Sequence, residues 1–216
     1  MHEFETNFKS DAYLEFTVDH LELPIFAVGI YLGMIQYVPD NLSKPWSVRT
    51  SWGLWNLLLS VFSMVGASRC IPKLLATFED KGFTYTVCGG EGPYPPTPDD
   101  AYDVVKYPHY LSNWYTTGPS GLWVFLFIYS KLPELLDTAF LVFQKKPVIF
   151  LHWFHHVTVL LYCWHAYHHQ VSSGLWFASM NYFVHSIMCV FYYPTQPESV
   201  ISRSNRLHAS GICTIS

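Results

Sequence analysis

The feature that most constrains the fold is a long stretch without charged residues. Between Lys146 and Glu198 the chain has no Asp, Glu, Lys or Arg over 51 residues. This length is enough for two membrane-spanning helices of about 20 residues each. Seven of the chain's 11 histidines fall within the stretch. An imidazole is costly to bury in lipid unless it faces a polar cavity or a partner, so a histidine cluster at membrane depth predicts a functional site.

The composition of the whole chain agrees with a membrane protein. Only 13% of the 216 residues are charged, which is about half the share found in an average soluble domain. The eight Trp and 15 Tyr are typical of the aromatic belts at membrane surfaces. The net charge of −4 provides no basic surface for nucleic acid. The five cysteines have no paired spacing, which argues against both a zinc ribbon and a disulfide framework.

Charge-free intervals predict an all-α fold, a polytopic transmembrane helix bundle with about five spans. The predicted spans are residues 23–39, 50–68, 121–143, 148–164 and 175–193. They form one membrane domain, residues 23–193, which follows an N-terminal segment, residues 1–22. That segment lacks the basic and apolar regions of a cleaved signal peptide. A polar divergent tail, residues 194–216, follows the domain.

A loop is predicted between the second and third spans, over residues 79–118, because its centre is rich in glycine and proline. Five spans would place the loop holding Lys44 and Arg49 on the same side as the loop holding Lys145 and Lys146. The positive-inside rule makes that side cytosolic.

Three histidines of the fourth span share one face of the predicted helix. His155 and His156 follow His152 at i+3 and i+4, which are neighbouring positions on a helix surface. Each buried imidazole needs its own hydrogen-bond partners, so a purely structural role for all three is disfavoured. Imidazoles support metal binding, acid–base catalysis or acyl transfer.

The same spacing recurs in a second histidine box at His165, His168 and His169. Two such boxes resemble those of membrane di-iron desaturases and hydroxylases. The boxes lie 13 residues apart on one predicted helix, or roughly 20 Å along its axis, so they cannot share one metal cluster. The second box also coincides with the end of the apolar stretch, which favours a polar helix end at the membrane surface.

Two further groups of polar residues occur within the spans. Asn181, His185 and Met188 lie on one face of the fifth span, where Asn181 could orient the His185 ring. Lys131 and Glu134 are spaced by three residues within the third span, as are Glu134 and Asp137. Charges in such a context face the protein interior and pair. They predict a polar lining near the histidines, partly in the form of a structural ion pair.

Three ordered motifs resemble those of the very-long-chain fatty acid elongase family, the ELO-type 3-oxoacyl-CoA synthases. They are Lys131-Leu-Pro-Glu134-Leu-Leu-Asp137-Thr138, His152-Trp-Phe-His155-His156-Val-Thr158-Val and Asn181-Tyr-Phe-Val-His185-Ser-Ile-Met188. The resemblance covers residues 44–192. Trp153, with no Gln just upstream of the box, is similar to the branch that extends saturated and monounsaturated chains.

The resemblance implies a multi-pass enzyme of the endoplasmic reticulum membrane. Such an enzyme condenses malonyl-CoA with a long-chain acyl-CoA to give CoA, carbon dioxide and a 3-oxoacyl-CoA, and it needs neither a cofactor nor a metal. The expected catalytic residues are His152, His155, His156 and His185. The expected supporting residues are Lys131, Glu134, Asp137, Asn181 and Met188. The expected partners are the two CoA substrates and the lipid bilayer, together with other enzymes of the elongation cycle or a second copy of the chain.

The chain departs from the family pattern after Met188, where Cys189 takes the place of the usual Tyr. Family members have two further spans, seven in all, and a basic tail, so the sequence predicts a C-terminally truncated form. Two alternatives therefore remain open beside the active enzyme. One is an inactive elongase that acts as a partner or scaffold, and the other is a metal-dependent membrane lipid desaturase or hydroxylase.

Overall fold

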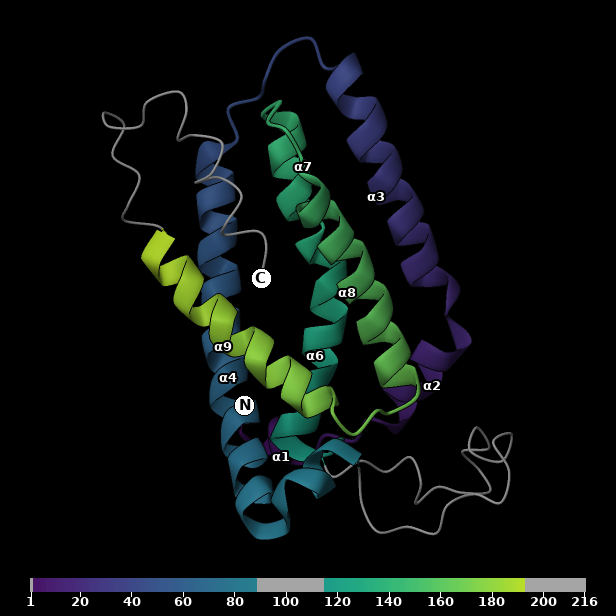
Figure 1. The fold of residues 1–216 in the computed structure, drawn as a ribbon, viewed down its shortest axis with the longest axis vertical. Helices are drawn as coiled ribbons and strands as arrows, with labels where there is room; N and C mark the ends of the chain where they lie inside the picture. The colour runs from purple at the N-terminus through teal and green to yellow at the C-terminus, as the bar shows by residue number, and fades with distance from the viewer. Residues whose placement is uncertain (1, 89–114, 193–216) are drawn as a thin grey trace. The chain divides into compact units, whose positions relative to one another are not determined.

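The computed structural model describes residues 2–88 and 115–192. Within these residues the secondary structure is helical, apart from an isolated antiparallel bridge between Lys9 and Thr117. The helices are α1 (His2–Thr6), α2 (Asp11–Asp19), α3 (Glu22–Asn41), α4 (Arg49–Cys88), α6 (Gly118–Glu134), α7 (Leu136–Phe143), α8 (Phe150–His168) and α9 (Gly174–Tyr192), as drawn in Figure 1. The predicted all-α fold is confirmed.

Helices occupy all five predicted spans, the third of which contains two. By length and apolar composition, two helical segments of the described chain could cross a membrane, Glu22–Asn41 and Thr50–Cys88. Two of the other helices do not meet this test of length and apolar composition, each for a different reason. α6 has only 17 residues before a break, and the five histidines of α8 lower its mean hydropathy. The fold is that of an all-α membrane protein with several spans.

The second predicted span is shorter than the helix that contains it. The sequence prediction ended this span near Arg69, where charged residues return, and began a loop at residue 79. α4 instead continues to Cys88, because charged residues form helix as well as apolar ones do. The helix is interrupted at Gly82, whose φ of 81° and ψ of 173° are not helical, so α4 consists of two helical segments joined by a kink. Glycine readily adopts such a positive φ. Most of the predicted loop and the whole tail lie outside the described residues.

The third predicted span is two helices rather than one. α6 ends at Glu134 and α7 begins at Leu136. Pro133 lies just before the break and weakens the last turn of α6, because it has no N–H to donate and its ring crowds the preceding turn. The Leu135 N–H bonds the Leu132 carbonyl at 3.3 Å in a tighter i→i+3 turn. This break lies between Lys131 and Asp137, two of the predicted site residues.

The chain forms two compact units. The first consists of Met1–Leu21, Gly66–Tyr129 and Tyr162–Met180, and the second of Glu22–Val65, Ser130–Leu161 and Asn181–Ser216. In the first unit, Thr17 of α2 is fully buried. Its hydroxyl bonds Tyr129 at 2.8 Å, and its carbonyl accepts from Trp164 at 3.3 Å. The N-terminal segment is therefore part of a packed core.

The second unit contains the predicted site. In it α3 packs against α7. The connection after α3 meets the end of α7, where the Trp46 N–H donates to the Phe143 carbonyl at 2.9 Å and the two rings stack. Lys146 lies 4.9 Å from the centre of the Trp52 ring. Each of the two loops predicted to share one side thus contacts the helix end next to the other loop, at the end of the unit where Figure 1 draws both connections.

Candidate functional site

The first histidine box lies on the first turns of α8, where its spacing places all three rings on adjacent positions. His152 is 1% exposed, and His155 and His156 are partly buried. The His156 ring centre lies 4.7 Å from that of His152 and 5.9 Å from that of His155. Among the described residues, the buried Nδ1 of His155 and the buried Nε2 of His156 have no hydrogen-bond partner.

Lys131 and Glu134 form the predicted ion pair at the end of α6. The Lys131 ammonium lies 2.8 and 2.7 Å from the two Glu134 carboxylate oxygens, and both residues are buried. Ser130 donates to the same carboxylate at 2.8 Å. The ammonium also donates to the side-chain oxygen of Asn181 at 3.2 Å. The pair therefore joins α6 to α9.

These groups and the histidines lie within electrostatic range of one another. His155 interacts electrostatically with Lys131 and Glu134. His156 interacts in the same way with His152, His155, Lys131 and His185. The four predicted catalytic histidines and the ion pair are therefore close together within the second unit. Met188 belongs to α9, but its side chain lies outside the described part of the chain.

Asp137 has a specific partner of its own. The Trp55 indole N–H donates to its carboxylate at 2.8 Å, and Asp137 is 6% exposed. It is the next residue, Thr138, that contacts the histidine box, through a 2.6 Å hydrogen bond to His152 Nε2. The break after Glu134 thus separates the ion pair on α6 from Asp137 and Thr138 on α7, each of which forms a hydrogen bond to another helix.

Sequence reasoning did not identify Tyr31, Trp55 and Thr138 as site residues. Tyr31 lies on α3 and bonds the Thr138 hydroxyl at 2.8 Å, and its ring centre is 6.3 Å from that of His156. The available signal for Tyr31 was a tyrosine in the middle of a largely apolar span. A buried tyrosine hydroxyl needs a partner, but the sequence does not indicate which one.

The second histidine box lies in the first unit, at the C-terminal end of α8. The ring centre of His169 is 4.3 Å from that of His165 and 4.4 Å from that of His168. Burial, together with the neighbouring His165, lowers the pKa of His168. Burial and both neighbouring histidines likewise lower the pKa of His169. His165 is exposed and the helix stops at His168, in agreement with a polar helix end.

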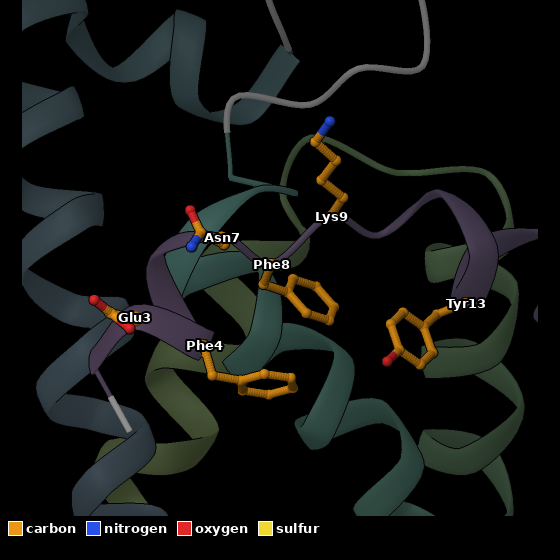
Figure 2. Close-up of a pocket in the computed structure, with 6 residues that line it drawn as sticks. All are labelled: Glu3, Phe4, Asn7, Phe8, Lys9 and Tyr13. Carbon is orange, nitrogen blue, oxygen red and sulfur yellow. The ribbon is translucent and has the colours of Figure 1, made fainter.

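The described side chains have two other features that bear on a site. No three of their His, Cys, Asp and Glu residues form a group that could hold a metal ion. A cavity of about 400 Å³ is an open hollow in the first unit beside α1. Its lining residues, drawn in Figure 2, are Glu3, Phe4, Asn7, Phe8, Lys9 and Tyr13. None of them is a predicted site residue.

The arrangement suits acyl transfer. Neutral imidazole is a nucleophile toward thioesters and also a general acid or base near neutral pH. The Lys131 ammonium and the Asn181 side chain provide fixed polarity beside it. Such groups are strongly effective in a water-poor site, since a low dielectric increases their interaction with a developing negative charge.

Comparison with known proteins identifies the family. Residues 16–208 match the ELO family, described as the GNS1/SUR4 family. Fatty acid elongase 3 of Trypanosoma cruzi is 44% identical over 194 residues, which make up 87% of this chain and 64% of the relative. Very long chain fatty acid elongase 6 of Drosophila melanogaster is 35% identical over 193 residues, or 88% of this chain and 54% of the relative.

A vertebrate relative is also similar. Very long chain fatty acid elongase 6 of Gallus gallus is 32% identical over 194 residues, or 88% of this chain and 64% of the relative. The chain spans less than two thirds of the length of each of these three relatives. No solved structure matches it. The match over most of the chain and the identities of 32 to 44% show that this protein belongs to the ELO (GNS1/SUR4) family.

Proposed function

We propose that this protein elongates fatty acids by condensing malonyl-CoA with a long-chain acyl-CoA. The observation that carries the proposal is the cluster of four histidines beside the buried Lys131–Glu134 pair. The relatives named as fatty acid elongases support the substrate class. The proposed location is the endoplasmic reticulum membrane, and the proposed partners are the two CoA substrates.

The first proposed step moves the acyl group to an imidazole. A neutral histidine nitrogen attacks the thioester carbonyl, the carbon–sulfur bond breaks, and CoA leaves as a thiolate that takes up a proton. His155 and His156 are the best candidates within the box, since each has a buried nitrogen without a hydrogen-bond partner among the described residues. A neighbouring imidazole can supply the proton.

The second proposed step forms the carbon–carbon bond. Malonyl-CoA loses carbon dioxide, and the electron pair of the broken bond becomes the enolate of acetyl-CoA. The enolate carbon attacks the acyl-imidazole carbonyl, which releases the histidine and yields a 3-oxoacyl-CoA two carbons longer. Lys131, Asn181 and His185 are the candidates to stabilise the enolate oxygen as its charge develops.

The test is condensation by the purified chain in detergent or bilayer discs. Labelled malonyl-CoA and a long-chain acyl-CoA should give labelled 3-oxoacyl-CoA and carbon dioxide. Replacing His155 or His185 by Ala should lower turnover at least about 100-fold, the low end of general acid–base contributions. His165→Ala is the matched control, since His165 is an exposed histidine of the same helix and should keep wild-type turnover.

Three outcomes would contradict the proposal. Condensation that is unchanged in both variants would remove the histidine cluster from the chemistry. Complete absence of condensation, with binding to full-length elongases intact, would favour a partner or scaffold role. Iron-dependent oxidation of a lipid by the purified chain would favour a desaturase or hydroxylase.

A further inference from the structure

Three buried side chains from three helices form a hydrogen-bonded row next to the histidine cluster. The Tyr31 hydroxyl on α3 lies 2.8 Å from the Thr138 hydroxyl on α7. The same Thr138 oxygen lies 2.6 Å from Nε2 of His152 on α8. Tyr31 is 2% exposed, Thr138 0% and His152 1%. All three belong to the second unit.

Tyr31 is unusual in its own helix. α3 has only two buried residues, Pro24 and Tyr31, whereas neighbours such as Ile25 and Ile30 are 64% and 75% exposed. An apolar helix of this kind would face lipid along most of its surface. The one hydroxyl that it buries meets the row, so the helix contributes to the site mainly through Tyr31.

The hydrogens of the row can be placed by counting donors. A threonine hydroxyl has one proton, so Thr138 can donate to Tyr31 or to His152 but not to both. Among the described residues, Thr138 is the only hydrogen-bond partner of the Tyr31 hydroxyl. If Thr138 donated to Tyr31, the buried Tyr31 proton would have no acceptor there, which is unfavourable. Tyr31 therefore donates to Thr138, and Thr138 donates to His152 Nε2.

We propose that Tyr31 and Thr138 are positioning residues that hold neutral His152 in the tautomer with its proton on Nδ1. With Nε2 accepting from Thr138 and Nδ1 protonated, His152 has no nitrogen lone pair left for a thioester. His152 then acts as a proton or hydrogen-bond donor, and the acyl group is carried by another histidine of the cluster. This assignment of roles rests on the proposed condensation, whereas the tautomer itself does not.

The direct test is nitrogen NMR of the full chain labelled with ¹⁵N-histidine in bilayer discs at pH 8, above the ordinary pKa of a histidine side chain. The His152 signals are those that disappear in His152→Gln. The expected result is a protonated Nδ1 and an unprotonated Nε2 in the wild type. Tyr31→Phe should give a mixture of both tautomers, because Thr138 is then free to accept from His152. Tyr37→Phe is the matched control, since this tyrosine of α3 is 70% exposed.

Enzyme activity provides a second measurement, because a residue that only packs in the core would not change kcat in the pattern expected here. Thr138→Val removes the hydroxyl at nearly constant volume and should lower kcat at least about tenfold with little change in KM, a smaller loss than the roughly 100-fold or more of a general acid itself. Thr138→Ser keeps the hydroxyl and should retain kcat within about threefold of the wild type. Melting temperatures of the variants separate this effect from misfolding.

The outcomes separate this inference from the proposed function. A wild-type His152 protonated on Nε2 would overturn the hydrogen-bond directions assigned to the row, whatever the activity. A tautomer on Nδ1 that Tyr31→Phe leaves unchanged would overturn the role of Tyr31. If the His152 tautomer and its change in Tyr31→Phe are as expected but the chain performs no condensation, the assignment of the row stands and the proposed function fails.

Discussion

The buried ion pair of Lys131 and Glu134 yields a prediction whose size follows from the structure. The ammonium touches both carboxylate oxygens, at 2.8 and 2.7 Å, and the two side chains are 5% and 10% exposed. Glu134→Leu would remove both oxygens and leave a positive charge inside the bundle. A charge stranded in this way costs much more than an exposed ion pair contributes.

The expected cost of Glu134→Leu is about 3–5 kcal/mol in the free energy of unfolding, the usual range when one partner of a buried pair is removed. Since 1 kcal/mol shifts the melting temperature by about 2–4 °C for a chain of 150–250 residues, the fall should be roughly 6–20 °C. Adding Lys131→Met removes the stranded charge. The double variant should regain most of the lost stability, because apolar replacement of a whole buried pair is often neutral or stabilising.

The assay is thermal unfolding of the wild type, the two single variants and the double variant in one detergent. Lys44→Met, which removes an exposed lysine, is the control and should change the free energy of unfolding by less than about 0.5 kcal/mol. A Glu134→Leu protein that melts within 2 °C of the wild type would show that the pair is not buried. A double variant no more stable than Glu134→Leu would show that the two charges do not compensate each other. Either result would refute the reasoning.

Three further predictions concern other parts of the chain. Extraction of membranes with alkaline carbonate should leave the protein in the pellet, and its release would contradict the membrane fold. Gly121→Ala should lower stability by about 1–3 kcal/mol because a Cβ there would overlap the Thr116 carbonyl, whereas the mid-helix Gly33→Ala, which meets no neighbour, should be neutral or stabilising. The lowered pKa values of His168 and His169 mean that the unfolded chain takes up protons first below about pH 6.5. Acidification from pH 7.5 to 5.5 should therefore lower the melting temperature more in the wild type than in His168→Gln/His169→Gln, and equal falls would contradict the effect.

Local periodicity explains why much of the site could be predicted from the sequence. His152, His155 and His156 had to share a helix face once the segment was helical, and they do. The i,i+3 spacing of Lys131 and Glu134 predicted their ion pair in the same way. The hydrogen bond from Lys131 to Asn181 joins two helices. The only sequence indication of that contact was the general need of a buried charge for polar partners.

The parts that could not be predicted depend on which helices pack together. Tyr31 and Thr138 are 107 residues apart, and Trp55 and Asp137 are 82 apart. Nothing in the spacing of either residue identifies its partner. The length of α4 was underestimated for a different reason. Charge-free intervals measure how much helix lies in lipid, and helix can continue into a segment with charged residues, as α4 does up to its kink at Gly82.

The central claim is that the histidine cluster carries the acyl group, and release of CoA before condensation tests it most directly. The chain is mixed with a long-chain acyl-CoA and no malonyl-CoA, and free CoA is measured over time. The account predicts a rapid burst approaching one CoA per active site, the kinetic sign of an acyl-enzyme. The burst should persist in His165→Ala and disappear when the acyl-carrying member of His155, His156 and His185 is replaced by Ala. Absence of a burst in a preparation that condenses both substrates, or a burst that survives all three replacements, would contradict the account.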